Sequence, residues 1–454
     1  MQDSSNSKSP VPLRRIINPQ AWESFFHLSS ARPHGVIGTP FTFVPTQQPM
    51  SQLPALVYRD KQPQTVDSSS PIVRIQKMIF DEAAAADASD VHIEPSQGST
   101  RVRYRVDGVL KESLEIPRWM HENLVVRIKV LARLDISERR LPQDGHITAE
   151  EAAGPDIRVS VLPTRWGEKI VLRILRRGRS LMTLAQLGFR PQVEEQLHGL
   201  IHRPQGMLLT VGPTGSGKTT TLYACVNEIR QEPINIVTIE DPIEYEIDGV
   251  SQVQVNEKTG LTFSKVLRAI LRQDPNVILV GEIRDADTAL TAFHAAMTGH
   301  LVMSTLHAAD AISALLRLTE LGIGRPVLSS ALIGVVAQRL ARLNCPACLE
   351  RDFPRPIYLK HLSIQEPQQE KLLQSKGCAQ CRFTGNRGRI GMYELMEITP
   401  RLRSTILAGS EFDIRDAARL DGLISLTRQA VELALKGDLS IREAYRTCNF
   451  EGGE

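Results

Sequence analysis

Eight consecutive residues, 212–219, have the composition of a phosphate-binding loop. Their string GPTGSGKT matches GxxxxGK[ST], follows the apolar run MLLTV and opens the helix-forming run TTTLYACVNEI. Glycines let backbone N–H groups surround a phosphate, and the start of a helix adds a positive dipole end. We expect Lys218 to contact the β- and γ-phosphates and Thr219 to hold Mg²⁺ with the nucleotide. The predicted nucleotide contacts are Gly212, Pro213, Thr214, Gly215, Ser216, Gly217, Lys218, Thr219 and Thr220.

Four carboxylates follow two further apolar runs and are candidates for the reaction that this loop implies. Glu240, Asp241 and Glu244 crowd together in TIEDPIE, and Glu282 directly follows VILVG. Like charges this close together are unfavourable unless a metal or arginines offset them. Nucleotide hydrolysis needs Mg²⁺ ligands and a group that orients the attacking water, and these carboxylates can divide those tasks. The alternatives are a solvated acidic turn and a charged strand end.

Two histidines bracket the apolar run LVMSTL, with His300 before it and His307 after it. A lone histidine is more often structural. A pair around a strand next to a nucleotide site favours a functional role, either sensing the γ-phosphate or hydrogen-bonding to the acidic residues.

Four of the six cysteines form two CxxC pairs separated by 29 residues. Two such pairs suit a tetrahedral Zn²⁺ site, and a closed set of four thiolates is structural rather than catalytic. The alternative is a set of unliganded thiols. Cys225 is expected to pack in the core, and Cys448 has no predicted partner. The predicted zinc ligands are Cys345, Cys348, Cys378 and Cys381.

The elements that must position these residues differ between two parts of the chain. Residues 71–175 combine short period-2 alternations with helical patterns at 73–88 and 119–134, which predicts a small α+β domain. From residue 206 apolar runs alternate with helical patterns, which predicts a parallel sheet covered on both faces. The predicted strands are 206–211, 235–240, 277–281 and 301–305, and the predicted helices are 218–231, 263–272, 285–298 and 308–321.

Composition limits the remaining classes. The chain has 454 residues, 42% hydrophobic and 23% charged, which predicts two to four globular domains. A formal charge of +3 argues against nucleic acid as a partner. We find neither a secretory signal nor an apolar run of about 20 residues, so we expect a cytoplasmic protein without a membrane span.

The first 71 residues hold 10 of the 27 prolines and 11 serines, which indicates a tail or a poorly packed module. The segment AWESFFHL (21–28) is a short amphipathic exception. It is interpreted either as a local helix or as a partner-docking segment.

Several longer strings extend these motifs. They are ASDVHIEP (88–95), RLDISERRLPQDG (133–145), LPTRWGEKIVLRIL (162–175), LRQDPNVILVGEIRDADTA (271–289) and TGHLVMSTLH (298–307). With them, residues 71–454 resemble the secretion ATPase superfamily, and within it the assembly motors of type II secretion (ATPase E) and type IV pili (ATPase B). The resemblance implies a hexameric ring with a RecA-like P-loop ATPase domain behind a PAS-like domain. It also implies ATP hydrolysis that drives pilin or pseudopilin assembly through an inner-membrane platform protein.

The resemblance implies roles for the acidic residues. Glu240, Asp241 and Glu244 match the Asp box of the family, with Glu244 expected to polarise the attacking water. Glu282 matches the Walker B glutamate.

It also implies roles for the histidines and for several arginines. His300 and His307 match the His box of the family. Arg158 and Arg173 match positions that reach the phosphates, a task suited to a permanent, forked charge. Weaker candidates for contacts between ring subunits are Arg268, Arg272 and Arg284.

The predicted organisation is α/β. It comprises an N-terminal tail or reduced docking segment (1–70), a PAS-like α+β domain (71–183) and a RecA-like ATPase domain (184–454). The last contains a tetracysteine zinc insertion (344–392) and a C-terminal helical part (393–454). The implied cofactors are ATP, Mg²⁺ and Zn²⁺. The short N-terminal segment departs from larger family members, which carry a folded docking domain, so the mode of membrane recruitment stays open.

Three other functions compete with an assembly motor located at the inner membrane through its partners. A pilus retraction motor is disfavoured by the four cysteines, because motors of that type usually lack them. A conjugative DNA-transfer ATPase is disfavoured by the near-neutral charge and by the Asp-box and His-box strings. A ring that binds ATP without turnover is disfavoured by Lys218, Glu244 and Glu282.

Overall fold

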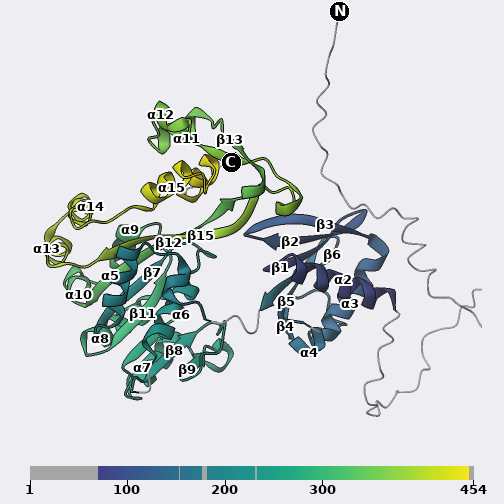
Figure 1. Ribbon diagram of the computed structural model, residues 1–454. Coiled ribbons are helices and arrows are strands. Elements are labelled where there is room, and N and C mark those ends of the chain that lie inside the picture. The colour runs from purple at the N-terminus through teal and green to yellow at the C-terminus, as the bar shows by residue number, and fades with distance from the viewer. Residues whose placement is uncertain (1–69, 153, 176–180, 231–232, 449–454) are drawn as a thin grey trace, which may run out of the picture. The chain divides into compact units, whose positions relative to one another are not determined.

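The computed structural model describes residues 70–448 apart from 153, 176–180 and 231–232 (Figure 1). The chain divides into two compact units after Arg176. The predictions for the N-terminal tail, including the amphipathic segment 21–28, lie outside the described residues. Among the helices of the described residues, none combines the length and the apolar character that a membrane crossing requires.

The first unit is a six-stranded antiparallel sheet with its helices packed on one face, in the order β3-β2-β1-β6-β5-β4. Ile75 and Ile79 of α2 and Leu124 of α3 pack on inward-facing strand residues such as Val91 and Ile170. The predicted α+β character is therefore confirmed. Its elements are α2 (Pro71–Ala85), β1 (Asp90–Pro95), β2 (Ser99–Val106), β3 (Val109–Pro117), α3 (His121–Leu131), β4 (Gln143–Ile147), α4 (Ala149–Ala152), β5 (Asp156–Thr164) and β6 (Gly167–Leu175).

A buried ion pair joins α3 to β6 in this unit. Lys129 Nζ lies 2.6 Å from Glu168 Oε1, and the exposed fractions of the two side chains are 1% and 9%. The same ammonium donates to the carbonyl of Glu138 at 2.7 Å. Because both charges are out of water, removing one partner leaves the other uncompensated.

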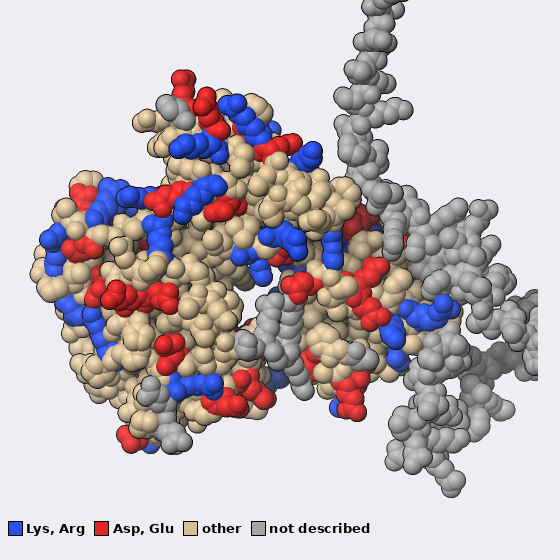
Figure 2. Space-filling model, in the orientation of Figure 1, with Lys and Arg blue, Asp and Glu red and all other residues tan. Residues whose placement is uncertain are grey.

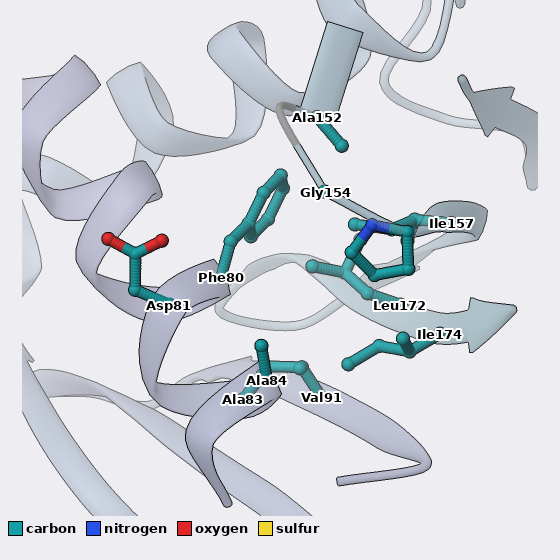
Figure 3. Close-up of a pocket in the computed structure, with 11 residues that line it drawn as sticks. Phe80, Asp81, Ala83, Ala84, Val91, Ala152, Gly154, Ile157, Leu172 and Ile174 are labelled. Carbon is teal, nitrogen blue, oxygen red and sulfur yellow. The ribbon is translucent and has the colours of Figure 1, made fainter. Parts of the chain in front are cut away.

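Figure 3 shows a small cavity in the first unit, between α2 and the strands. Phe80, Ile157, Leu172 and Ile174 contribute apolar side chains to it, and the Asp81 carboxylate points away from them. The cavity lacks the convergent polar groups that a phosphate ligand requires. This cavity is therefore not a candidate for the predicted phosphate site.

The second unit contains a seven-stranded sheet in the order β15-β12-β7-β11-β10-β8-β9. Six neighbouring strands are parallel, as predicted, but the edge strand β15 runs antiparallel to β12. This edge lies outside the four predicted strands, and β15 is antiparallel because β12 and β15 form one long hairpin around the cysteine segment. The strands are β7 (Gly206–Val211), β8 (Ile236–Glu240), β9 (Ser251–Gln254), β10 (Val277–Val280), β11 (Leu301–Leu306), β12 (Leu332–Asn344) and β15 (Asn386–Glu397).

Helices cover both faces of this sheet, as Figure 1 shows. Met207 and Leu209 of β7 join one apolar cluster while Leu208, between them, joins the other, so the strand is buried on both sides. The α/β prediction is confirmed. The helices before the cysteine segment are α5 (Pro191–Ile201), α6 (Lys218–Ile229), α7 (Phe263–Ile270), α8 (Ala286–Met297), α9 (Ala311–Glu320) and α10 (Arg325–Ala331).

The cysteine segment lies between the two strands of the hairpin. It contains β13 (Leu349–Arg351), α11 (Pro356–His361), α12 (Glu366–Gln369) and β14 (Leu373–Ser375). Four helices follow β15: α13 (Pro400–Ala408), α14 (Glu411–Leu420), α15 (Leu426–Leu435) and α16 (Ile441–Cys448). Glu443 of α16, which is 3% exposed, binds the guanidinium groups of Arg342 and Arg446 and so ties α16 to β12.

Charge is mixed on the face of the molecule that Figure 2 shows. Figure 2 shows Lys and Arg side chains interspersed with Asp and Glu on the face in view. The described residues on this face therefore form no broad field of one sign, in agreement with the small net charge.

Candidate nucleotide site

The phosphate-binding loop joins β7 to α6 in a backbone conformation that only glycine allows at key points. Gly212 has φ +152°, and a Cβ there would lie 2.6 Å from both the carbonyl of Gln338 and Ser216 Oγ. Gly217 caps α6 at φ +91°. Lys218 Nζ donates to the carbonyls of Gly212 (2.9 Å) and Pro213 (3.0 Å). The lysine therefore lies along the rim of the loop, where it can meet phosphate oxygens.

The charge of Lys218 depends on its surroundings. Burial lowers the pKa of the ammonium, Glu282 opposes that effect, and Arg339 adds to it. Phosphate oxygens favour the charged form, because an opposite charge within a few ångströms stabilises it. The lysine is thus placed to gain from an anionic ligand.

The acidic residues and one histidine meet the loop at one edge of the sheet. Strands β7, β11, β10 and β8 are adjacent and parallel. In register across these strands lie Leu209, Ser304, Val280 and Ile239, in the same order. Residues that follow these strands therefore lie along the same carboxyl edge, which is the ligand-binding edge of open α/β sheets.

Glu282 is at the centre of an exposed charge network at this edge. Its Oε1 lies 3.1 Å from His307 Nε2, and its Oε2 accepts from Arg284 Nε at 2.9 Å. Arg284 Nη1 lies 3.5 Å from Asp241 Oδ2. The structure therefore brings together Glu282, His307 and Asp241, three of the residues that the sequence analysis predicted at the site. Arg284, predicted at a subunit contact, bridges two carboxylates here.

Glu240 occupies a different environment from its acidic neighbours. It is 3% exposed, and its carboxylate accepts hydrogen bonds from Tyr223, Thr238 (2.6 Å) and Gln252 (3.1 Å). Most of its acceptor capacity is used inside the protein, so it is suited to holding the segment in place. The half-buried Glu244 and the exposed Asp241 have side chains nearer to solvent. The Asp241–Pro242 peptide bond is cis.

The two predicted histidines are not brought together. His307 follows β11, whereas His300 precedes it, where Nδ1 contacts the carbonyl of Ala295 at 3.1 Å. At about 3.3 Å per residue, the strand separates them by roughly 20 Å. His300 therefore lies at the opposite edge of the sheet from Glu282.

The two predicted phosphate-binding arginines lie in the first unit. Arg158 of β5 is directly opposite Arg173 of β6, so both side chains are on one face of that sheet. Arg173 Nε contacts Asp90 Oδ1 at 3.2 Å. The pair can present two guanidinium groups to one anion.

Of the other predicted arginines, Arg268 lies on α7 and Arg272 follows the end of that helix. Arg268 and Arg272 have exposed side chains, and Arg272 Nη1 donates to the carbonyl of Arg268 at 2.7 Å. The carboxylates of the nucleotide edge have no hydrogen bond or ion pair to either arginine among the described contacts.

Strand β12 contributes contacts that the sequence analysis missed. Gln338 Nε2 donates to the carbonyl of Ser216 in the loop at 2.8 Å, and the adjacent Arg339 donates to the carbonyl of Ala309 at 2.5 Å. Both side chains are at least 96% buried. The available signal was a Gln-Arg pair inside the apolar run LIGVVAQRLARL, which is unusual for a buried strand.

The four predicted zinc ligands converge. All four sulfurs lie within 4.8 Å of one another, and the Cys345–Cys378 and Cys348–Cys381 pairs are both 3.9 Å apart. A tetrahedral site with Zn–S bonds of about 2.3 Å requires sulfur separations of about 3.8 Å. The geometry therefore fits zinc.

Backbone amides add to this fit. The N–H groups of Cys378 and Gly385 donate to the sulfur of Cys381 at 3.1 and 3.3 Å. Burial would raise the pKa of this thiol, but these hydrogen bonds lower it to about 6. A thiolate, the form that binds metal, is therefore favoured at this position.

Cys225 and Cys448 lie outside the group of four cysteines. Burial raises the pKa of Cys225 to about 12, in agreement with its predicted packing role in α6. Cys448 is partly buried against the core and donates to the carbonyl of Leu426 at 3.9 Å.

A family model and several known proteins match most of this chain, and they agree on one family. The family model described as "Type II/IV secretion system protein" matches residues 65–446. Type II secretion system protein E of Aeromonas hydrophila is 44% identical over 385 residues, which cover 84% of this chain and 76% of the relative. The type IV pilus assembly ATPase PilB of Thermus thermophilus is 43% identical over 371 residues, which cover 81% of this chain and 42% of that protein.

Solved structures share the fold. The crystal structure of the pilus retraction motor PilT with bound ADP has a TM-score of 0.55 at 27% identity and covers 81% of this chain and 95% of its own. The ATPase DotB of Legionella pneumophila has a TM-score of 0.61 at 20% identity and covers 82% of this chain and 94% of its own. At that identity, the second likeness concerns the fold alone.

Proposed function

Because the chain belongs to the Type II/IV secretion system protein family, whose members are ATPases of secretion or pilus assembly, we propose that it acts as a hexameric motor. In this proposal, hydrolysis of Mg-ATP at residues 212–220 drives the assembly of pseudopilins or pilins through an inner-membrane platform protein. Identity of more than 40% to both a type II secretion protein E and a pilus assembly ATPase supports either machine.

The observation that carries the catalytic part is the Glu282 network beside the phosphate loop. We assign Lys218 to the β- and γ-phosphates and Thr219 to Mg²⁺, with Glu282 orienting the water or the metal. Glu244 polarises the attacking water, and His307 orients Glu282 through their 3.1 Å contact. Arg158 and Arg173 are proposed phosphate contacts on the ground of the family resemblance alone.

Zinc has a structural role in this proposal. Cys345, Cys348, Cys378 and Cys381 hold one Zn²⁺ that closes the end of the β12–β15 hairpin. The ion supplies cross-linking of the segment and no chemistry at the nucleotide. The presence of this site supports an assembly motor over a retraction motor.

The test combines solution and cellular measurements. The purified chain should hydrolyse Mg-ATP, and turnover per chain should rise with the fraction of hexamer measured by light scattering. Deletion of its gene should abolish fibres or secretion, and wild-type protein but not Glu244→Gln should restore them. An excess of fibres after deletion would instead identify a retraction motor, and a chain that binds ATP without turnover would identify a scaffold.

A further inference from the structure

Tyr223 lies between the phosphate loop and the acidic segment 240–247. It is on α6, four residues after Thr219, so the two side chains are on the same face of the helix. Its side chain is 1% exposed. The hydroxyl donates to Glu240 Oε2 and accepts from the backbone N–H of Glu244 at 3.4 Å. One phenol thus contacts both ends of the turn around Pro242.

The acidic segment is also held from the β9 side. Gln252 Nε2 donates to Glu240 Oε1 (3.1 Å) and to the carbonyl of Tyr245 (3.0 Å), and its Oε1 accepts from the N–H of Ile247 (2.8 Å). Glu240 is therefore an internal anchor shared by α6 and β9. Its position sets the path of the chain that carries Glu244.

The phenol of Tyr223 stays protonated in this setting. Burial raises its pKa, and the neighbouring Glu240 carboxylate raises it further. It therefore remains a hydrogen-bond donor to Glu240. The ring also packs edge-on against Tyr245, with centroids 6.0 Å apart.

We propose that Tyr223 is a positioning residue that holds the acidic segment, and with it Glu244, in register with the metal-binding end of α6. This inference rests on the proposed role of Glu244. A turn of the helix joins Thr219 to Tyr223, and two hydrogen bonds join Tyr223 to the segment. The distance between the water-polarising carboxylate and the Mg-nucleotide is thereby fixed by α6.

The variant that tests this is Tyr223→Phe in the full chain, which keeps the ring and its packing on Tyr245. We expect kcat to fall by at least about tenfold while KM for ATP stays within about twofold, because a misplaced group affects the chemical step more than ground-state binding. A purely structural role would leave kcat of the folded fraction unchanged. Near-UV circular dichroism and titration with a fluorescent ATP analogue measure folding and binding. The matched control is Tyr358→Phe. It removes a hydroxyl from a ring of the cysteine segment that packs on Tyr445 of α16.

A double variant tests the route through Glu240. If Tyr223 acts through this carboxylate, Tyr223→Phe/Glu240→Gln should lose no more kcat than the worse single variant. Losses that multiply, or a folded Tyr223→Phe protein with wild-type kcat, overturn the inference. A rise in KM that accounts for the whole defect also overturns it.

Glu244→Gln, measured alongside, separates this inference from the proposed function. Wild-type turnover in Glu244→Gln refutes the role of Glu244. An inactive Glu244→Gln beside a fully active Tyr223→Phe refutes only the inference drawn here.

Discussion

Replacing Glu282 by Gln should separate catalysis from stability. The side chain is 22% exposed, and its partners Arg284 and His307 are 55% and 51% exposed. Ion pairs this open to solvent contribute less than about 1 kcal/mol each. Glutamine keeps an oxygen for Arg284, so we expect the free energy of unfolding to change by less than about 1 kcal/mol, or a few degrees in Tm.

The expected effect on turnover is far larger. Loss of one preorganised group that stabilises developing charge lowers kcat by about 10²–10³-fold, or about 2.7–4.1 kcal/mol at 1.36 kcal/mol per decade. ATP binding at pH 7 should persist, because the phosphate loop is unchanged. Without Glu282 the pKa of Lys218, already lowered by burial, falls further, so ATP binding should weaken more at pH 9 than at pH 7.

Phosphate release at saturating Mg-ATP, ATP-analogue titration and thermal unfolding measure the three quantities on one preparation. The matched control is Glu320→Gln, which removes a carboxylate from an exposed pair with Arg317 at 2.8 Å. Turnover within threefold of wild type in an assembled Glu282→Gln ring would refute the assignment. So would a fall in stability large enough to explain the lost activity.

Three further predictions concern sites away from the nucleotide. Cys345→Ser should lower bound zinc, measured by metal analysis, from one ion per chain to a small fraction and reduce Tm. Lys129→Met should destabilise the protein by about 3–5 kcal/mol in urea unfolding, because Glu168 is left buried without its partner, and pairing it with Glu168→Leu should recover most of that loss. Burial would raise the pKa of Glu443, but hydrogen bonds from its two arginine partners lower it to about 2, so the stability it contributes should be present above about pH 4.5 and disappear as the pH falls towards 2. Glu443→Gln should therefore unfold more easily than wild type at pH 7 and equally easily below pH 2.

Much of the second unit could be predicted because its signals are local. The predicted strand 206–211 has the observed bounds, and helices 218–231 and 285–298 differ from the structure by at most two residues at an end. The loop motif and the CxxC pairs are short strings whose chemistry needs those residues at that spacing.

The β12–β15 hairpin could not be predicted in the same way. Its two strands are separated in sequence by the whole cysteine segment, and their pairing depends on contacts that no local pattern records. The contact of Gln338 with the phosphate loop depends on a second such pairing, the parallel pairing of β12 with β7. The different environments of Glu240 and Asp241 could not be predicted either. These carboxylates are adjacent in the sequence, and the hydrogen bonds from Tyr223 and Gln252 to Glu240 distinguish them.

Strand order explains why Glu282 is central to the site. Its strand, β10, lies between β11, which ends at the His307 side, and β8, which ends at the Asp241 side. Glu282 therefore contacts the histidine directly and reaches the acidic segment through Arg284. Among the described residues, His300 makes no such contact. It precedes β11, whereas His307 follows it, so the two histidines lie at opposite ends of this strand and at opposite edges of the parallel sheet.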